Sequence, residues 1–543
     1  MNLSDTIRTV LNNIKHEGLT DIFPRPFEVD LLKNSIFYNQ IVSEVKDSIT
    51  KALDENGSGL LTLKVHPISH VLYPKKEAFD FRKCALIDVL DTVKYFTLVM
   101  LLAKDIEKAR INKSKNCIFS YRYKIEKDNP YIFDKNYNYT TFTKQSNENL
   151  KKKDVKVVVK CDISNFYDRL NLHRLESSLL SITDKKNVVK LINELLLFWA
   201  NRDSYGLPVG SNPSRILAES LLIDVDKFLL SHKVSFCRFV DDYRLFAPDA
   251  KTAHYWLTLL VERLSIEGLF INQSKTAIED VSNRNEDKTN EDKTNEDKTN
   301  ENEKPKDEFK EDIISEKRII SGYSGTIPTK FRNSSENEIT KIKTNDYIDL
   351  ISHVENSKII LPDEFREYCK ILIYKELYDN FKLLPYLLNN FPQFTPYVTD
   401  LLLKFRNKIP LEIRAHLRNE FSIWLNVKEV YIPEYIAIAL VKLLSDKSYL
   451  DLQVIFDYFR QLKRNAGSYI GRATLEALEP IIERGQVLEI RQYYSRADNW
   501  EKRQIVKIID LHLHREEKNA WFKNITMNDS TDPFLIQTFK PKK

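Results

Sequence analysis

Three consecutive copies of the pentapeptide NEDKT, at residues 285–299, constrain the fold of this 543-residue chain more than any other feature. The repeat contains no apolar residue, so it cannot contribute to a core and is predicted to form a solvated loop. Before it, short β-rich runs alternate with helical stretches, whereas after about residue 340 the pattern is almost entirely helical. We therefore expect separate domains on the two sides of the repeat.

Composition narrows the class of protein. Apolar residues make up 42% of the chain, and 83 basic against 78 acidic residues leave a net charge of +5, so a nucleic acid partner would need a local basic channel. The five cysteines form no C-x-x-C pair, which argues against a zinc ribbon or a disulfide framework and fits a reducing cytoplasm. The longest apolar run, 96–103, is too short to span a bilayer. We expect a cytoplasmic protein with no membrane partner.

Recurring helix starts mark the region after the repeat: LPDE at 361, IPLE at 409 and IPEY at 432. Proline in the first turn followed by an acid suits a helix N-terminus. Many helices without strands favour stacked helical pairs of the HEAT-like kind. A plain helical bundle is the alternative.

An aspartate ends a predicted strand in the stretch DVKVVVKCDISNFYDRL, residues 154–170. Strand alternation places three valines and Cys161 on one face and Asp162 on the other. A helical pattern follows, so Asp162 also fits the role of a helix cap. On this stretch alone the functional and the capping interpretations are equally supported.

The stretch CRFVDDYRLF predicts a β-hairpin with strands over 234–240 and 243–247 and with Asp241 and Asp242 at its turn. Aspartates favour turns, so the pair alone is weak support for a site. Asp162 supplies a third carboxylate at a second strand end, and converging carboxylates raise one another's pKa unless a cation lies among them. Oxygen ligands select Mg²⁺ or Mn²⁺, and two such ions can promote an in-line phosphoryl displacement.

A loop rich in glycine and proline lies between these stretches and contains Gly206, Pro208 and Gly210, before a helix that starts at 212–214. Glycine in a turn before a helix lets backbone approach a ligand closely. Most such turns, however, are only turns.

Four short motifs, taken in chain order, resemble the palm motifs of a reverse transcriptase. They are D-I-S-N-F-Y, G-L-P-V-G-x-x-x-S-R-x-x-A-E, F-V-D-D and G-L-F-I-N-Q-S-K-T. Upstream, YPKKEAFDFRKCALIDVLDTVKYFTLV at 73–99 resembles the fingers of bacterial enzymes of this family. The resemblance covers roughly residues 60–280. It implies an α+β fold, with right-hand polymerase fingers and a ferredoxin-like palm followed by an all-α helical-repeat domain. It also implies RNA-directed or template-independent DNA synthesis by two-metal nucleotidyl transfer, with Mg²⁺ or Mn²⁺ as the cofactor.

The resemblance assigns the metal ligands and the sugar contact. Asp162, Asp241 and Asp242 would bind the catalytic metal ions, together with the backbone carbonyl of Ile163. Tyr167 matches the steric-gate position, which packs under the deoxyribose and excludes a 2′-hydroxyl. A core aromatic is the alternative for Tyr167.

The resemblance also implies contacts to the triphosphate. Arg82 matches the fingers arginine that holds the incoming triphosphate, with Lys75 or Lys76 beside it, and a planar, permanently charged fork suits polyphosphate. Lys275 matches a lysine that acts as a general acid toward pyrophosphate. An ordinary surface lysine is the alternative for Lys275.

The remaining nucleotide-binding positions come from the glycine-rich loop. Pro208, Gly210 and Ser214 match the loop and helix start that pack near the templating base and the nucleotide. Val209 stands where glutamine is common in the family, so one side-chain amide is missing from the expected nucleotide site.

A palm followed by helical repeats in place of a conventional thumb resembles the bacterial abortive-infection and defence-associated reverse transcriptases. This implies a role in antiphage defence, a homo-oligomer, and untemplated or protein-primed synthesis. The expected partners are dNTPs, a DNA product and an RNA template. A retron- or intron-like enzyme copying a defined RNA, and a non-catalytic sensor of nucleic acid or phage protein, are the alternatives. The predicted domains are an N-terminal helical extension (1–60), fingers and palm (61–280), the low-complexity insertion (281–312), a connector (313–345) and the helical-repeat domain (346–543).

Overall fold

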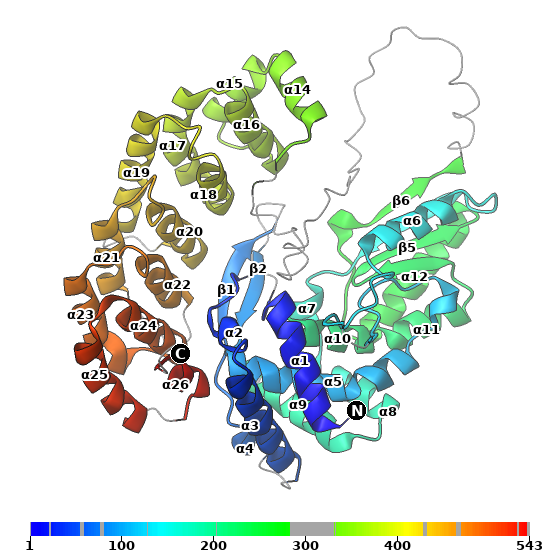
Figure 1. Cartoon of the computed structure of the whole chain (residues 1–543). Helices are drawn as coiled ribbons and strands as arrows, with labels where there is room; N and C mark the ends of the chain where they lie inside the picture. The colour runs from blue at the N-terminus through cyan, green and yellow to red at the C-terminus, as the bar shows by residue number, and fades with distance from the viewer. Residues whose placement is uncertain are drawn as a thin grey trace. The chain divides into compact units, whose positions relative to one another are not determined.

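The computed structural model of the chain (Figure 1) describes residues 2–20, 23–54, 59–75, 81–126, 129–201, 203–282, 331, 333–426, 432–462, 469–528 and 531–539. Contacts divide the chain into two units. The first comprises Met1–Pro67 and Val89–Tyr323, and the second comprises Ile68–Asp88 and Ser324–Lys543. The NEDKT repeat, predicted to be a loop, lies outside the described residues.

A four-stranded antiparallel sheet in the order β4-β5-β3-β6 forms the centre of the first unit's functional region. Its central strand β3 is rich in valine, which suits a pleated and largely buried surface. On β3, Val157, Val158 and Val159 are all buried, so both faces are covered at this end of the strand. The strands are β3 (Val157–Asp162), β4 (Phe236–Phe239), β5 (Asp242–Ala247) and β6 (Ala277–Asp280).

Helices cover both faces of this sheet. Helix α6 packs against β4 and β5, and α12 packs against β3 and β5. Beside the sheet, α5 is buried along nearly its whole first half and is contacted by α1, α3, α8, α9 and α10. The N-terminal helices therefore share the core of this unit, and the predicted boundary at residue 60 falls inside it.

The helices of the first unit have the following bounds: α1 (Leu3–Glu17), α2 (Glu28–Leu31), α3 (Ser35–Asp54), α4 (Gly59–Leu63), α5 (Val89–Ala109), η1 (Lys113–Lys115), α6 (Tyr139–Leu150), α7 (Phe166–Arg169), α8 (Leu172–Ile182), α9 (Lys186–Trp199), α10 (Asn212–Leu221), α11 (Ile223–Ser231), α12 (Ala250–Ile266) and η2 (Gln273–Lys275).

The second unit combines one β-hairpin with the C-terminal helices. The hairpin consists of β1 (Ser69–Pro74) and β2 (Phe81–Leu86), paired antiparallel. Strand β1 contacts α20 and α22, and the ring of Phe81 lies 5.8 Å from that of Tyr435 on α20. The sequence prediction grouped this hairpin with the fingers and palm, whereas its contacts group it with the helices.

The helices of the second unit have the following bounds: α14 (Glu336–Thr344), α15 (Ile348–Asn356), α16 (Pro362–Tyr374), η4 (Tyr378–Leu383), α17 (Leu384–Asn390), η5 (Pro392–Phe394), α18 (Thr395–Lys404), α19 (Leu411–Asn426), α20 (Glu434–Leu444), α21 (Leu452–Gln461), α22 (Tyr469–Leu478), α23 (Arg484–Tyr493), η6 (Tyr494–Arg496), α24 (Asn499–His512), α25 (Arg515–Asn528) and α26 (Pro533–Phe539). The predicted helix starts are confirmed, since α16, α19 and α20 begin at or one residue after Pro362, Pro410 and Pro433.

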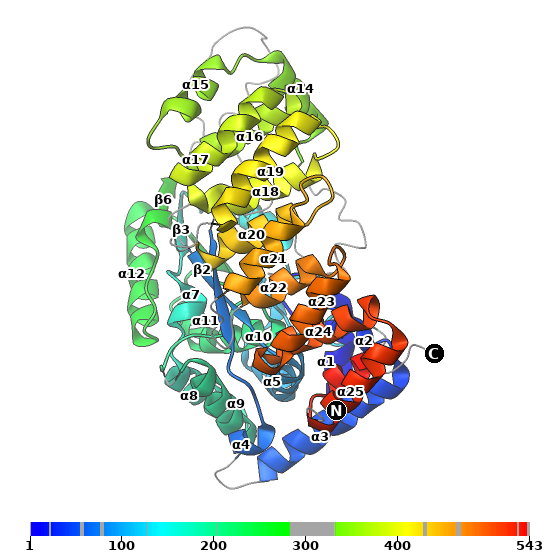
Figure 2. The same cartoon turned by 90° about the vertical axis from the view of Figure 1, so that its left-hand side faces the viewer.

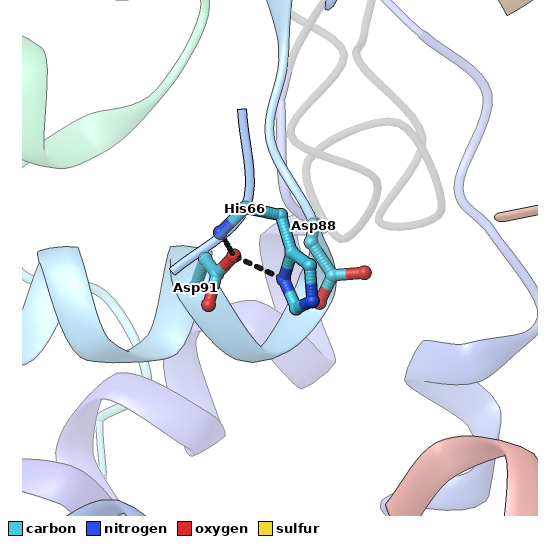
Figure 3. A group of neighbouring side chains, drawn as sticks. All are labelled: His66, Asp88 and Asp91. Atoms are coloured by element: carbon cyan, nitrogen blue, oxygen red, sulfur yellow. Dashed lines mark hydrogen bonds and ion pairs between the residues drawn. The ribbon is translucent and has the colours of Figure 1, made fainter. Parts of the chain in front are cut away.

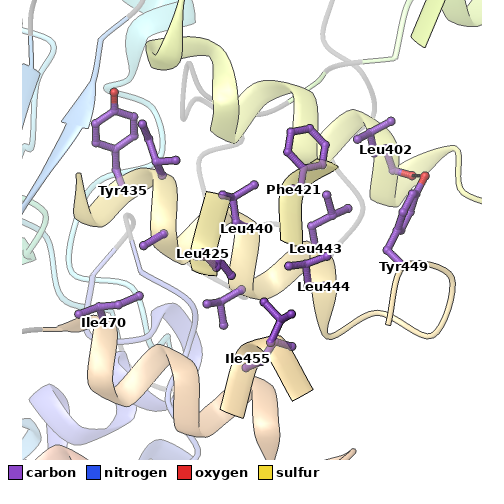
Figure 4. Packing of buried hydrophobic residues seen from close by; sticks show 14 of the residues in the cluster. Leu402, Phe421, Leu425, Tyr435, Leu440, Leu443, Leu444, Tyr449, Ile455 and Ile470 are labelled. Carbon is purple, nitrogen blue, oxygen red and sulfur yellow. Dashed lines mark hydrogen bonds between the residues drawn. The ribbon is translucent and has the colours of Figure 1, made fainter. Parts of the chain in front are cut away.

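Alternate helices of the second unit pack against one another: α18 on α20, α20 on α22 and α22 on α24, while α19 packs on α21 (Figure 2). Helix α24 also packs on α26, which is labelled in Figure 1. Side chains of successive helices share one apolar core. Figure 4 shows Leu440 and Leu443 of α20 gathered with Phe421 and Leu425 of α19 and Ile455 of α21. This arrangement is a stack of helical pairs.

The predicted α+β class is confirmed, because a small antiparallel sheet with its helices is followed by a helical C-terminal region. Among the helices that the structure describes, none combines the length and the apolar character needed to cross a membrane.

Candidate active site

Two of the predicted carboxylates face each other across neighbouring strands. Asp162 is the last residue of β3, and its cross-strand partner is Asp242, the first residue of β5. Directly paired residues of an antiparallel ladder point to the same face, with Cβ atoms about 4.5–5.5 Å apart. The prediction that Asp242 lies in the hairpin turn is wrong, because it already belongs to β5, and this pairing brings it against Asp162.

Backbone hydrogen bonds hold the third carboxylate beside this pair. Asp241 lies in the turn between β4 and β5, and its carbonyl oxygen accepts the N–H of Ile163 at 3.1 Å. The N–H of Asn272 donates to the carbonyl oxygen of Asp162 at 2.6 Å. The segments after β3, before β5 and before η2 are thus joined where the three carboxylates meet.

Electrostatics at this position reflect three acids in a small volume. Burial, together with the negative charges of the neighbouring Asp162 and Asp242, raises the pKa of Asp241 to about 7. Burial also raises the pKa of Asp242 to about 6, with a contribution from Asp162, although Arg244 acts in the opposite direction. In the metal-free fold, the nearby Lys275 and Arg244 therefore do not fully offset the cost of ionising Asp241 and Asp242.

Lys275 on η2 lies next to the carboxylates. Its Nζ is 3.6 Å from Oδ2 of Asp162, and its side chain is 48% exposed. This contact places Lys275 beside the predicted metal ligands, and its role as a general acid stays a prediction.

The donor set fits a hard divalent cation. The carboxylates of Asp162, Asp241 and Asp242 offer oxygen atoms, and the peptide of Ile163 is tied to Asp241. The raised pKa values show that positive charge would be favoured among them, and Mg²⁺ or Mn²⁺ prefers oxygen ligands. These residues could hold the predicted cofactor.

The predicted gate, Tyr167, is fixed by the glycine-rich loop. The N–H of Leu207 donates to the carbonyl oxygen of Tyr167 at 2.9 Å, and the N–H of Gly206 donates to that of Leu170 at 2.9 Å. Gly206 has a φ of 100°, a left-handed conformation in which other residues are strained. Asp241 lies close enough to Tyr167 to affect the pKa of its hydroxyl, which burial raises well above its usual value.

The other predicted nucleotide-binding residues lie in the glycine-rich loop and at the start of helix α10. Pro208 is buried, and Gly210 has a φ of 111°. Ser214 is fully buried on α10, and its hydroxyl is 3.1 Å from the hydroxyl of Tyr95 and 3.2 Å from that of Ser211. Ser214 therefore acts on the loop by packing, since its hydroxyl is already engaged inside the unit.

The predicted triphosphate ligands lie on the hairpin of the second unit. Arg82 is exposed on β2, where it pairs with Tyr73 of β1. Lys75 follows β1 and is half-buried, and Lys76 lies outside the described residues. Their role in binding the triphosphate stays a prediction.

A second group of polar residues, drawn in Figure 3, has a structural explanation. Nδ1 of His66 is 2.8 Å from Oδ2 of Asp91, and the backbone N–H of His66 donates to the same oxygen at 2.7 Å. Nζ of Lys94 lies 3.3 Å from the other oxygen of Asp91 and donates to the carbonyl oxygens of Leu63 and Lys64. Asp91 and Lys94 therefore tie the segment before β1 to helix α5.

Sequence analysis missed one charged residue of the catalytic hairpin, Arg238 on β4. It is fully buried and bonded to Glu219 and Asp226. The signal was available, because in CRFVDDYRLF a charged residue occupies a strand position between apolar neighbours.

A comparison of the sequence with known protein families agrees with the predicted resemblance. Residues 76–300 match the family model described as Reverse transcriptase (RNA-dependent DNA polymerase). The matched range contains Asp162, Tyr167, Asp241, Asp242 and Lys275. The chain thus carries a reverse transcriptase domain with the fingers and palm of that fold, and it is an enzyme of the nucleotidyltransferase class.

The solved structures that match the chain include two telomerases. Telomerase from Candida albicans, in complex with a fragment of telomeric RNA, aligns at 14% identity over 88% of this chain and 71% of that chain, with a TM-score of 0.31. Apo telomerase from Candida tropicalis aligns at 12% identity over 84% of this chain and 73% of that chain, with a TM-score of 0.30. No curated protein matches the sequence.

Proposed function

We propose that the protein is a DNA polymerase of the reverse transcriptase class that joins deoxynucleotides by two-metal nucleotidyl transfer. The observation that carries the proposal is the cross-strand pairing of Asp162 with Asp242, with Asp241 beside them in the turn. Three acids lie together here, and burial and mutual repulsion raise the pKa of two of them, Asp241 and Asp242, which is unfavourable for the fold alone. The arrangement becomes useful when the acids bind cations that also contact phosphate.

In the proposed reaction, a 3′-hydroxyl oxygen loses its proton to solvent and attacks the α-phosphorus of a dNTP. The bond from that phosphorus to the β-phosphate's bridging oxygen breaks, and pyrophosphate leaves. Bound Mg²⁺ or Mn²⁺ would stabilise the charge on the attacking and leaving oxygens. Lys275 donates a proton to the pyrophosphate, Tyr167 packs against the deoxyribose, and Arg82 binds the triphosphate.

Incorporation of labelled dNTPs tests this proposal. Purified protein is treated with nuclease and incubated with each labelled dNTP and Mg²⁺, with and without an added primed RNA, and products are resolved before and after protease. The proposal expects incorporation by the wild type and incorporation lower by about 10³-fold or more in Asp241→Asn. Absence of incorporation under every condition would contradict it.

The same gels separate three modes of synthesis. Label that migrates with protein until protease treatment would support priming from a tyrosine hydroxyl. Label found only on the added primer, in an order set by the RNA, would support ordinary RNA-directed synthesis. Growth of a primer without a template would support untemplated synthesis.

We further propose that this activity serves antiphage defence in a bacterial cytoplasm, with the protein as a homo-oligomer. The stack of helical pairs after the palm supports the defence role through its resemblance to HEAT-like domains. Plaque counts on bacteria that express the protein test it, with Asp241→Asn as the control. Protection that survives Asp241→Ala combined with Asp242→Ala would favour a non-catalytic sensor, and a dedicated RNA gene beside the coding sequence would favour a retron- or intron-like enzyme.

A further inference from the structure

Strand β4 places a buried arginine directly behind the catalytic carboxylates. Arg238 is 0% exposed and pairs with Tyr243 across β4 and β5, next to the pair formed by Phe239 and Asp242. Successive residues of a strand point to opposite faces, so Arg238 lies on the face opposite Asp242. A buried guanidinium is costly unless its charge and its N–H groups are satisfied.

Two buried acids from neighbouring helices satisfy this guanidinium. Asp226 of α11 accepts bonds from Nε at 2.9 Å and from Nη2 at 2.6 Å, a bidentate pair. Glu219 of α10 accepts from Nη2 at 2.9 Å and is also bonded by Arg110 at 2.6 Å. Burial alone would raise the pKa of Glu219, but Arg110 and Arg238 outweigh it and lower this pKa. Arg110 and Arg238 thus balance the charges of Glu219 and Asp226, and Arg110 continues the network to Glu107 at 3.3 Å.

The same guanidinium reaches the catalytic turn. Nη1 of Arg238 donates to the carbonyl oxygen of Val240 at 2.8 Å. Val240 has a φ of 57°, in the left-handed region, where a β-branched residue is strained. Its carbonyl belongs to the peptide that leads into Asp241. A strained backbone conformation of this kind persists only where the surrounding structure stabilises it. The hydrogen bond from Arg238 to the Val240 carbonyl oxygen is one such stabilising contact.

We infer that Arg238 is a positioning residue for nucleotidyl transfer: anchored by Glu219 and Asp226, it fixes the Val240 peptide and thereby the direction of the Asp241 and Asp242 carboxylates toward their metal ions. The inference rests on the proposed function. Arg238 does not touch the reacting atoms, since it lies on the opposite face of the sheet. Its effect passes through one backbone hydrogen bond.

A merely structural role would give a different pattern, and the chain offers a matched control. Arg122 is also buried in the first unit, 2% exposed. It pairs at 3.0 Å with Glu107, which in turn pairs with Arg110 at 3.3 Å, and it donates to the carbonyl oxygen of Ile111 at 2.8 Å. Arg122 thus belongs to the same group of buried charges as Arg238, but these bonds do not run to the Val240 peptide. Arg122→Lys and Arg238→Lys each replace a buried, planar guanidinium group by a single ammonium group. If both arginines only support the fold, both variants lose activity in proportion to stability.

The experiment compares wild type, Arg238→Lys and Arg122→Lys in the full-length protein. Thermal unfolding, kcat and KM for dNTP, and Mn²⁺ binding followed by electron paramagnetic resonance are measured for each. Arg238→Lys is expected to lower kcat about 10²-fold and to weaken Mn²⁺ binding about 10- to 100-fold, with KM for dNTP changed less than about threefold. Arg122→Lys is expected to keep kcat and Mn²⁺ binding within about threefold of the wild type, even where both variants lose the same amount of thermal stability.

The measurements on the two arginine variants distinguish a positioning role of Arg238 from a purely structural one. Equal effects of the two variants, or wild-type Mn²⁺ binding in Arg238→Lys, would overturn the inference. If Arg238→Lys does not fold, Asp226→Asn replaces it, because this change loosens the bidentate anchor and is expected to act in the same direction. If the wild type incorporates no dNTP, the proposed function fails, and Mn²⁺ binding still tests the positioning. A wild type that binds no Mn²⁺ overturns both.

Discussion

The two units of the protein use buried charge in different ways. In the first unit, Arg238 and its acids lie behind a turn that carries a reactive group, and one bond reaches that turn. In the second unit, buried Arg503 of α24 pairs with Asp532 at 2.8 Å and with Asp88 at 2.9 Å, so it joins segments far apart in the chain. The contrast teaches that buried ions can orient a site in one unit and tie elements together in another.

The two units also differ in what their side chains contribute to stability. In the first unit, Asp162, Asp241 and Asp242 lie partly exposed where the central strand β3 ends and β5 begins, and their like charges destabilise the metal-free fold. The stacked helices of the second unit are held by apolar side chains. Changes at these three carboxylates should therefore affect chemistry more than stability, and changes in the apolar core of the second unit should do the reverse.

The largest expected effect is that of Asp241→Asn. The variant removes one metal ligand and keeps the shape of the side chain, so incorporation should fall about 10³-fold or more. Its unfolding temperature without metal should not fall, because a repelling charge has been removed. Primer-extension assays and thermal unfolding check this, and a folded variant with near-normal activity would break the contrast.

The next effect lies in the second unit. Leu440 of α20 is 0% exposed, and Leu440→Ala should lower the free energy of unfolding by about 2–5 kcal/mol. Leu411 of α19 is 72% exposed, so Leu411→Ala is the matched control and should stay within about 0.5 kcal/mol. Denaturant unfolding measures both, and Mn²⁺ binding by the first unit should be unchanged in each. Equal losses for the two leucines would contradict the packing of the helical core.

Lys275→Gln should act on chemistry alone. The change removes the general acid 3.6 Å from Asp162 and should lower kcat about 10²-fold, with little effect on stability. Rapid-quench kinetics with dNTPs carrying different leaving groups measure it. An unchanged kcat would assign Lys275 to the ordinary surface.

The smallest expected effect concerns metal and pH. The pKa of Asp241 rises on folding from 3.8 to about 7, so the folded state holds the proton more tightly and the metal-free protein should lose stability as the pH rises through this window. At pH 8, Mg²⁺ at ten times its dissociation constant should restore about 1.4 kcal/mol in the wild type. Thermal unfolding with and without Mg²⁺ checks this, and Asp241→Asn should respond less. An equal response would place the bound Mg²⁺ elsewhere.

Sequence patterns predicted the parts of this site that depend on local order. Strand alternation and the adjacent aspartates indicated a metal site, and proline marked the helix starts. The pairing of Asp162 with Asp242 depends on strand register, which local sequence did not reveal, so Asp242 was assigned to the turn. Arg238 was missed because a charged residue in a strand is usually assumed to be solvated, and only the partners from α10 and α11 explain its burial.

The placement of the β1–β2 hairpin with the C-terminal helices was also beyond local patterns. Phe81 and Tyr435 are distant in sequence, and their contact follows from the tertiary fold. Motif order groups the hairpin with the palm, whereas its packing groups it with the helices. Ser214 illustrates the same limit, since its motif indicated a nucleotide contact and its hydroxyl is engaged with Tyr95 and Ser211.

Anomalous diffraction from crystals grown with Mn²⁺ and a non-hydrolysable dNTP tests the central claim most directly. The account predicts manganese peaks bonded to carboxylate oxygens of Asp162, Asp241 and Asp242 in the wild type, and their loss in Asp241→Asn. Manganese found only at other positions, with these three carboxylates free of metal, would contradict it.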